Sequence, residues 1–431
     1  MLAAVRSQVS SPPRLRLLLV THTLPHDEAG GSQAYVQALA SALRATNDVC
    51  VLSGSTRGPT DLQVRTVPRL PPLTAGADTL TQAWWHSRDQ WSPRQHLRVR
   101  REIERFAPDV VHTHQCQGLT SAVFSAIAAT GLPHVHTAHD LNLLCMNTRM
   151  HRGGEECSGR CAACLVQRGI RASLVARRLD FLIAPSERFR RVHVAAGVVP
   201  DERALTIHQG AEPGEGFERG RRRGPLRVGF IGTLAGHKGI PTLLGAVEAS
   251  RRAWTLEIAG DGPLATRVSE AVRTNTRIAY QGGVAGEEKE AFFARIDVLA
   301  VPSEGEENAP LAVTEACVRG IPTVVSDRGG LAETPLASVV ASRDPDALAA
   351  AIDRFDADRE ELGARSRLLL ERADTFSWKR HTDAVAAVLY RARCLAPPAA
   401  PMLLPVRRAA ATGLGLIRPV DSRARSSPDG R

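Results

Sequence analysis

Apolar runs of strand length alternate with helical patterns along the first half of the chain. The first run, Arg14–His22, is almost continuously apolar, and in the next stretch, Ser32–Arg44, apolar residues recur at helical spacing. Near-continuous apolar strands that alternate with helices indicate a parallel sheet covered on both faces. On the same grounds we expect further strands at 48–54, 109–115, 133–140, 181–186 and 204–210, and a helix at 119–129.

The second half of the chain repeats this alternation. Its expected strands are 226–234, 254–260, 277–283, 297–303 and 321–327, and its expected helices are 241–252, 287–295, 309–318, 345–355, 359–373 and 378–393. Residues 211–225, between the halves, are rich in glycine, proline and charge, so we expect a linker there. The pattern predicts two doubly wound, Rossmann-like α/β domains, in which ligands bind beyond the carboxyl ends of the strands.

We divide the chain on this basis. The predicted parts are an N-terminal extension (1–13), a first domain (14–210), the linker (211–225), a second domain (226–375), a C-terminal helix (376–394) and a basic tail (395–431) that we expect to be disordered.

The composition indicates a globular protein with a basic surface. No apolar run in the 431 residues approaches the roughly 18 that a membrane-spanning helix needs. The apolar stretch 15–20 is too short for a secretory signal, so we interpret it as a strand and expect a cytoplasmic protein. The net charge of +10 could favour anionic lipid, nucleic acid or phosphorylated substrates. With only 4% aromatic residues and no aromatic–basic pattern that suggests a base-stacking platform, nucleic acid is not expected.

Two basic amphipathic segments, 96–106 and 403–418, could contact an anionic membrane from its inner face. A packed helix and a disordered tail explain the same two patterns without a membrane.

Small residues and one lysine follow predicted strands where an anion could bind. Gly30 and Gly31 lie in the loop before a helix whose expected N-cap is Ser32, and they would let backbone N–H groups approach an anion. Lys238 precedes a helix in the second domain and could act as a point charge on a phosphate. Each signal is weak alone, because a tight turn or a surface lysine gives the same pattern.

The segment "SEGEENAPLAVTEACVRGIP" carries two glutamates, Glu307 and Glu315. Because Pro310 suits the first turn of a helix, we expect that helix to begin near Asn308 as its N-cap. Glu315 would then lie roughly 10 Å further along than Glu307. We interpret the pair as two grips on one elongated ligand, with helix N–H groups between them offered to a diphosphate. An acid/base pair or a metal site fits this spacing less well.

The order of these motifs resembles the family 4 retaining glycosyltransferases, which have the GT-B fold. The matching pieces are "AGGSQAYVQALASAL", "HTAHD", "GFIGTLAGHKGIPTLLGA", "AGDGPL", "VPSEGEENAPLAVTEACVRGIPTVVSDRGGLAE" and "FSWKRHTDAVAAVLYRAR". They cover most of 14–393, and the E-x7-E segment with its following G-x-P and D-x-G-G is the most specific of them.

The resemblance implies residue roles. Gly30 and Gly31 would contact the donor phosphate, His139 would line the donor-sugar pocket, Glu307 would bind the transferred sugar and Glu315 the ribose hydroxyls. The backbone of Asn308, Ala309, Pro310 and Leu311 would meet the diphosphate, Lys238 would neutralise it, and the turn ending at Val284 would pass the nucleobase. Glu307, His139 and Lys238 are the expected catalytic residues. Thr233 stands where the family usually has arginine, so one cationic contact to the diphosphate is missing there.

The implied activity is transfer of a sugar, with retention and without a metal, from a UDP-, GDP- or dTDP-sugar to an acceptor hydroxyl. Such a reaction would serve glycan, glycolipid or glycosylated-metabolite biosynthesis. Two alternatives keep the fold: a sugar-nucleotide epimerase, which the E-x7-E pattern disfavours, and a non-catalytic scaffold or partner subunit, for which Thr233 is the only hint.

Four cysteines cluster in an insert of the first domain. Cys145, Cys157, Cys161 and Cys164 are spaced 12, 4 and 3 apart, which suits a structural, tetrahedral Zn²⁺. Reduced thiols in a loop are the alternative. The last three also have the spacing of iron–sulfur ligands in radical enzymes, but those follow the first strand of a barrel.

Overall fold

The computed structural model describes residues 13–395 except 29, 56–57, 74–76, 147, 149, 153–154, 157–161, 177 and 215–223. All described residues belong to one compact unit. The predicted N-terminal extension and tail lie almost entirely outside the described part.

The first sheet has seven strands in the order β3-β2-β1-β4-β5-β8-β9, and every pair in it is parallel. Its strands are β1 (Arg16–Thr21), β2 (Asp48–Ser53), β3 (Gln63–Thr66), β4 (Val110–Thr113), β5 (His134–Thr137), β8 (Phe181–Ala184) and β9 (Ala204–Thr206). The order reverses between β1 and β4, which is where α/β sheets of this kind bind ligands.

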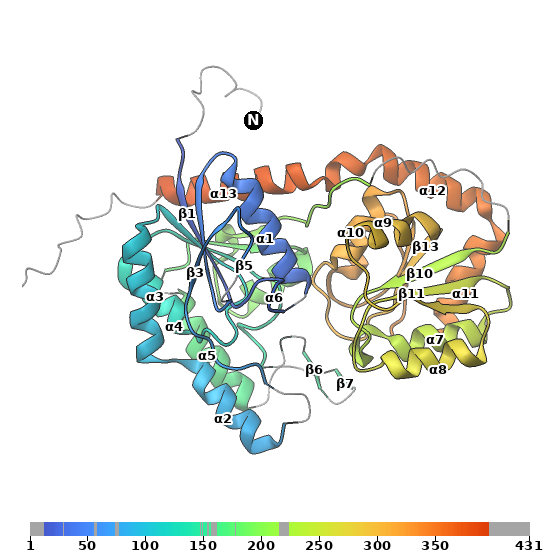
Figure 1. The fold of residues 1–431 in the computed structure, drawn as a ribbon, viewed down its shortest axis with the longest axis horizontal. Helices are drawn as coiled ribbons and strands as arrows, with labels where there is room; N and C mark the ends of the chain where they lie inside the picture. Colours follow the sequence, from blue (N-terminus) through green and yellow to red (C-terminus); the bar gives the residue numbers. More distant parts are fainter. Residues whose placement is uncertain are drawn as a thin grey trace, which may run out of the picture. The chain divides into compact units, whose positions relative to one another are not determined.

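The helices of the first domain lie beside this sheet (Figure 1). They are α1 (Gly31–Arg44), α2 (Thr79–Gln90), α3 (Pro93–Phe106), α4 (Ala122–Thr130), α5 (Ala162–Ala176) and α6 (Glu187–Ala195), and a short hairpin is formed by β6 (His151–Arg152) and β7 (Glu155–Glu156). Alternate residues of β1 enter two different cores. Leu18 packs in one core cluster with Val99 of α3, and Leu19 packs in another with Leu39 of α1. The continuous apolar run of β1 is therefore explained by burial on both faces.

The second sheet has six parallel strands in the order β12-β11-β10-β13-β14-β15. They are β10 (Arg227–Ile231), β11 (Thr255–Ala259), β12 (Ile278–Tyr280), β13 (Val298–Val301), β14 (Thr323–Ser326) and β15 (Ser338–Val340). The helices of this domain are α7 (Ile240–Ala249), α8 (Ala265–Thr274), α9 (Gly286–Arg295), α10 (Leu311–Val318), α11 (Pro345–Ala357) and α12 (Arg359–Glu371). The predicted fold of two doubly wound parallel-sheet domains is confirmed. Two edge strands, β3 and β15, were not predicted, because each is short and little buried.

The last described helix, α13 (Trp378–Leu395), packs on the first domain (Figure 1). Its Val385 and Leu389 belong to the same core cluster as Leu39 of α1. Two hydrogen bonds reinforce this packing: Tyr390 Oη donates to Asn47 Oδ1 at 3.0 Å, and Tyr35 Oη lies 2.8 Å from His381 Nε2.

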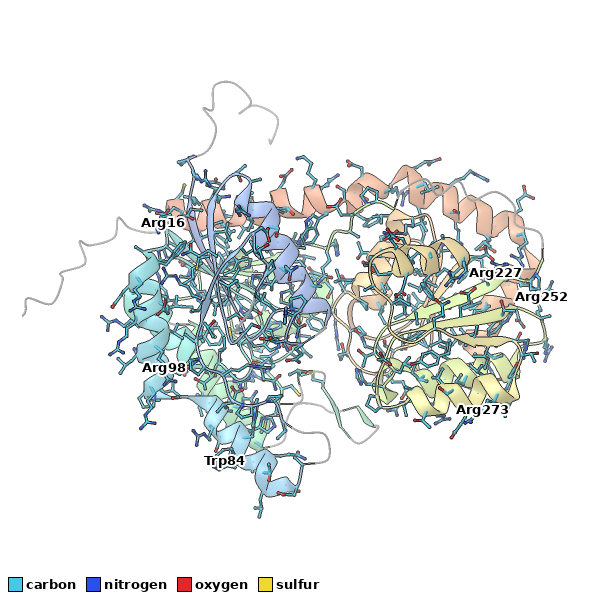
Figure 2. The ribbon with its side chains drawn as sticks, in the orientation of Figure 1. Arg16, Trp84, Arg98, Arg227, Arg252 and Arg273 are labelled. Atoms are coloured by element: carbon cyan, nitrogen blue, oxygen red, sulfur yellow. The ribbon has the colours of Figure 1, made fainter. Side chains whose placement is uncertain are left out.

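Basic side chains are spread over the surface of both domains (Figure 2). Arg16, Arg98, Arg227 and Arg273 are exposed on four different elements, and Arg252 is exposed in the loop between α7 and β11. Among the described residues, no helix is apolar over a length that would cross a bilayer.

Candidate functional site

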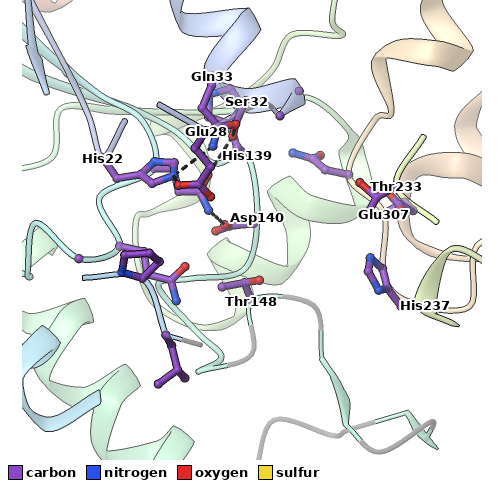
Figure 3. A pocket seen from close by; sticks show the side chains of 18 of the residues that line it. His22, Glu28, Ser32, Gln33, His139, Asp140, Thr148, Thr233, His237 and Glu307 are labelled. Atoms are coloured by element: carbon purple, nitrogen blue, oxygen red, sulfur yellow. Dashed lines mark hydrogen bonds and ion pairs between the residues drawn. The ribbon is translucent and has the colours of Figure 1, made fainter. Parts of the chain in front are cut away.

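A cavity of about 520 Å³ is lined by residues of both domains. Figure 3 shows His22, Glu28, Gln33, His139 and Asp140 on one side of it and Thr233, His237 and Glu307 on the other. These residues follow β1, β5, β10 and β13, so they lie at the carboxyl ends of central strands in both sheets. The cavity therefore occupies the place where the fold predicts a ligand.

Lys238 and Glu307 form an ion pair in this cavity. Lys238 Nζ lies 2.6 Å from Glu307 Oε1, and the two side chains are 22% and 13% exposed. Ser303 Oγ donates to the same carboxylate oxygen at 3.1 Å. Gly239 makes this approach possible: its φ is +73°, and a Cβ there would lie 1.8 Å from the carbonyl oxygen of Pro302. Only glycine fits so close to the end of β13 in that conformation.

The helix after Glu307 begins later than expected. Helix α10 starts at Leu311 with Pro310 as its N-cap, so the predicted N-cap role of Asn308 is wrong. The Asn308 side chain instead donates from Nδ2 to the carbonyl of Ala138 at 2.6 Å. The longer loop keeps Glu307 and Asn308 in the cavity lining.

Glu315 lies outside the lining of this cavity. On α10 its Oε1 pairs with Lys289 Nζ of α9 at 2.6 Å. Val284 packs against the core cluster around Phe292, and it too is absent from the cavity lining. The structure thus brings Glu307 together with His139 and leaves Glu315 in a separate ion pair.

Gly30 and Gly31 line the cavity at the start of α1. Helix α1 begins at Gly31 with Gly30 as its N-cap, so the predicted N-cap role of Ser32 is wrong. The Ser32 hydroxyl lies 2.9 Å from both Gln33 Oε1 and Gln115 Oε1 and can donate its one hydrogen to either. A Cβ on Gly30 would lie 2.3 Å from Gln33 Oε1, whereas one on Gly31 would meet Leu311 at an ordinary 3.7 Å.

The remaining predicted donor residues surround the same region. Thr233 lines the large cavity beside His237 and Lys238. Ala309 and Pro310 line a second, smaller cavity of about 70 Å³ next to His208 and Gln209.

His139 is partly buried and packs against other aromatic rings. Its Nε2 lies 3.0 Å from Nδ1 of His114, and its ring meets the Tyr35 ring edge-on with centroids 4.8 Å apart. Burial lowers the pKa of His139 to about 3, and the nearby His381 and His22 act in the same direction. His139 is therefore neutral near pH 7 and can contribute a hydrogen bond but not a positive charge.

The first domain adds polar cavity residues that the sequence did not single out. Arg69 Nη1 donates to Glu28 Oε2 at 3.2 Å, and Gln115 Nε2 donates to Asp140 Oδ2 at 2.8 Å. His22 lies 3.2 Å from Gln33 Nε2, and its burial lowers its pKa to about 4. His22 follows β1 and Asp140 follows His139, so their places after strands could have identified them, whereas nothing in the sequence marks Arg69.

The predicted zinc site lies partly outside the described residues. Cys145 and Cys164 are buried in the first-domain core, but Cys157 and Cys161 are not described. The part of the chain that is described contains no group of three or more metal-ligating side chains. Zinc binding by the full set of four cysteines stays a prediction.

Two family models match the chain. One, described as glycosyltransferase family 4, matches residues 29–215, and the other, described as glycosyl transferases group 1, matches 225–358.

Curated relatives match over shorter stretches. A GDP-mannose-dependent alpha-mannosyltransferase from Corynebacterium glutamicum is 35% identical over 103 residues, 24% of each chain. A D-inositol 3-phosphate glycosyltransferase from Mycobacterium marinum is 39% identical over 111 residues, 23% of this chain and 22% of the relative. An uncharacterized 42.6 kDa protein in the cps region of Klebsiella pneumoniae is 20% identical over 258 residues, 59% of this chain and 66% of that protein. The matched part spans less than two thirds of each curated relative.

Solved structures match over most of the chain. HepE from Anabaena in complex with UDP-glucose has a TM-score of 0.65 at 16% identity and covers 88% of this chain and 100% of its own. Sucrose-phosphate synthase from Thermosynechococcus elongatus has a TM-score of 0.68 at 20% identity, and the match covers 88% of this chain and 98% of the synthase chain. At these identities the likeness establishes the fold.

Proposed function

The chain belongs to the family 4 glycosyltransferases with the GT-B fold, and from this premise we propose that it transfers a sugar from a nucleotide-diphosphate-sugar to an acceptor hydroxyl. The observation that carries the proposal is the Lys238–Glu307 ion pair in a cavity that His139 lines from the other domain. This arrangement offers a cation for phosphate and a carboxylate for sugar hydroxyls within one cavity.

The proposed donors are UDP-, GDP- and dTDP-sugars. Structural neighbours were solved with UDP and with UDP-glucose, and one curated relative is named for GDP-mannose. In this chain Lys238 and His237 line the cavity beside Thr233, so these two side chains are the proposed contacts to the diphosphate where the family's usual arginine is absent. Gly30 and Gly31 at the start of α1 would approach the same phosphates with their backbone.

The proposed reaction retains the configuration of the sugar and needs no metal. The bond between the sugar's anomeric carbon and the diphosphate breaks, and the acceptor oxygen bonds to that carbon on the same face. The acceptor's proton passes to the leaving phosphate oxygen, so no protein base is required. Lys238 and the N–H groups at the start of α10 would stabilise the negative charge that develops on the diphosphate.

His139 and Glu307 would hold the sugar between the two domains. Because His139 is neutral, it would act through a hydrogen bond to a sugar hydroxyl. Glu307 would accept hydrogen bonds from other hydroxyls while Lys238 turns toward the phosphate. Since both residues follow strands of rigid sheets, the distance between them would depend on how closely the two domains approach each other. Close approach of the domains would also exclude water from the donor.

The acceptor would enter from the first-domain side, where Arg69, Glu28 and Asp140 line the cavity. We also propose peripheral contact with an anionic membrane, as for a lipid-linked acceptor, but not through segment 96–106. In α3 that segment buries Val99 and Ile103, so it is a packed helix, and 403–418 lies outside the described residues.

Helix α2 carries the exposed apolar side chains that support such a contact. Leu80 and Trp84 are 83% and 56% exposed, and Trp84 is labelled in Figure 2. The Arg88 guanidinium lies over the Trp84 ring, 4.8 Å from its centroid. Trp and Arg at one surface suit the interface of an anionic bilayer. Cosedimentation with vesicles containing phosphatidylglycerol should fall for Trp84→Ser, and equal binding by both proteins would remove the proposal.

A panel of nucleotide-sugars tests the proposed function. We expect at least one UDP-, GDP- or dTDP-sugar to yield nucleoside diphosphate, with transfer unaffected by EDTA and NMR of the product showing the donor's anomeric configuration. If no donor binds or turns over, the non-catalytic scaffold becomes the better explanation. Change of the sugar while it is still bound to the nucleotide would instead indicate an epimerase.

A further inference from the structure

The side chain of Asn308 connects the two domains through both ends of its amide. Nδ2 donates to the carbonyl oxygen of Ala138 at 2.6 Å, and Oδ1 accepts from Ser186 Oγ at 3.2 Å. Asn308 is 8% exposed, and Ala138 and Ser186 are buried. Since one end of the amide donates and the other accepts, its orientation is fixed, and a carboxylate could not make the same pair of contacts.

The Asn308–Ala138 hydrogen bond joins the two halves of the candidate site. Each of its two residues is adjacent in sequence to a candidate catalytic residue. Asn308 directly follows Glu307, which is paired with Lys238. Ala138 directly precedes His139, which is bonded to His114. One hydrogen bond therefore links the backbone beside the donor-side carboxylate to the backbone beside the cavity histidine.

Both ends of this link rest on close backbone packing. Gly330 N donates to the carbonyl of Glu307 at 2.7 Å, and a Cβ on Gly330 would lie 2.0 Å from the carbonyl oxygen of Asn308 and 2.5 Å from Ser186 Cβ. On the other side, Ala138 N donates to the carbonyl of Ile183 in β8 at 2.9 Å. The segments on either side of the Asn308–Ala138 bond are thus held by their own domains.

A second contact crosses between the same domains without touching either catalytic candidate. The carboxylate of Glu333 accepts from the backbone N–H groups of Glu187 and Arg188, at 2.7 and 2.6 Å, at the N-terminus of α6. Glu333 lines the smaller cavity next to Gln209, not the large one. It therefore provides a matched comparison: it helps to hold the domains together but is not adjacent to Glu307 or His139.

We propose that Asn308 is a positioning residue that sets His139 against Glu307 and so decides whether a bound donor sugar reacts with the acceptor or with water. This inference rests on the proposed function. Because the link acts after the donor is bound, its loss should lower kcat and raise the share of donor lost to hydrolysis, with little change in the KM for the donor. A contact that only holds the domains together would change donor KM or melting temperature instead.

The test compares Asn308→Asp and Asn308→Ala with Glu333→Gln. Asn308→Asp keeps the size of the side chain and the acceptor for Ser186 but turns an oxygen toward the Ala138 carbonyl. For both Asn308 variants we expect kcat for transfer to fall about 10- to 100-fold, the scale of a small misplacement of reacting groups, and the hydrolysed fraction to rise. Glu333→Gln should keep both kcat and the hydrolysed fraction of the donor within about threefold of the unaltered protein. For kcat this limit corresponds to about 0.7 kcal/mol of activation free energy.

Hydrogen–deuterium exchange gives a readout that does not depend on activity. With UDP or GDP bound, Asn308→Ala should speed exchange in the peptide around Ala138 and His139, whereas Glu333→Gln should speed it at the start of α6. Unchanged exchange around His139, unchanged kcat in both Asn308 variants, or an equal loss of kcat in Glu333→Gln would each overturn the inference. An unaltered protein that transfers no sugar would count against the proposed function, while the exchange data would still decide whether Asn308 positions His139.

Discussion

Lys238 and Glu307 belong to different loops of one domain, yet their charged atoms lie 2.6 Å apart in the cavity. The two side chains pair with each other, and each is the proposed contact for a different part of the donor. Glu307→Gln keeps the shape and removes the charge, so sugar transfer should fall about 100-fold or more if the carboxylate holds the reacting sugar.

The measurement is kcat/KM for transfer together with donor affinity by calorimetry. Glu304→Gln is the control, because Glu304 lies in the same loop but bonds to Arg343 and Thr242 and does not line the cavity. Full transfer by Glu307→Gln would contradict the role assigned to Glu307.

Glu315 should affect nucleotide binding more than turnover. The resemblance assigns it to the ribose hydroxyls, and in the structure its carboxylate is paired with Lys289 at 2.6 Å. We expect Glu315→Ala to weaken nucleotide binding by about 1.5–3 kcal/mol, the scale of a hydrogen bond to a charged group, with kcat at saturating donor nearly unchanged. Calorimetry with UDP and GDP measures this effect, and unchanged nucleotide affinity would show that the Lys289 pair is purely structural.

A buried ion pair lies within the first domain. Arg171 Nη2 lies 2.6 Å from Asp89 Oδ2, with 3% and 1% of the side chains exposed, and Asp89 also accepts from Gly118 N. Arg171→Met leaves Asp89 buried without its cation, and burial already raises the pKa of that carboxyl. The free energy of unfolding should fall by about 3–5 kcal/mol in urea denaturation. The control, Asp383→Asn, breaks a highly exposed pair with Lys379 and should change it by less than about 1 kcal/mol.

Stability should fall as the pH drops from 7 to 5. Burial lowers the pKa of His112, His134 and His139 to about 3 and that of His193 to about 4. Between those values and the ordinary 6.5, the unfolded chain binds protons that the folded chain does not, so acid favours unfolding. Each such histidine contributes up to about 1.4 kcal/mol per pH unit in that window. Unfolding free energies measured at several pH values between 5 and 7 give the slope of stability against pH, and His193→Gln should reduce that slope. An unfolding free energy that does not change with pH would contradict the conclusion that these histidines are neutral in the folded protein.

The cysteine insert should hold about one zinc ion per chain. Metal analysis of freshly purified protein measures this, and Cys161→Ser should lower the content because it removes one of four thiolates. Cys394→Ser is the control, since Cys394 is exposed on α13 and far from the insert in sequence. Less than about half an equivalent of zinc in the unaltered protein would leave four reduced thiols as the explanation.

The alternation of apolar runs and helices was enough to predict the fold, because strands buried on both faces leave a strong apolar signal. The same signal placed His139, Thr233 and Glu307 after strands, and the structure puts all three around one cavity. It missed Arg69 and Glu28, which come from loops whose course depends on packing with residues distant in sequence. Local propensity cannot report such contacts.

The two wrong helix caps have the same physical cause. Ser32 and Asn308 are both good N-cap residues, and propensity alone favours them at helix starts. In the structure Ser32 bonds to Gln115 and Asn308 to Ala138, partners 83 and 170 positions away in the chain. In these two cases the side chain bonds to a long-range partner instead of capping its own helix.

Helix α13 makes the first domain depend on a segment that is synthesised after all the strands of the second domain. Val385, Leu389 and Tyr390 complete a core that otherwise consists of residues from the first half. On a ribosome, the second domain has all its strands by Val340, while the face of the first sheet that packs against α1 still lacks its second helix, α13. The domain made first is therefore finished last, and until then its apolar face is open to chaperones and to aggregation. For the same reason, a fragment ending before Trp378 should not give a stable first domain.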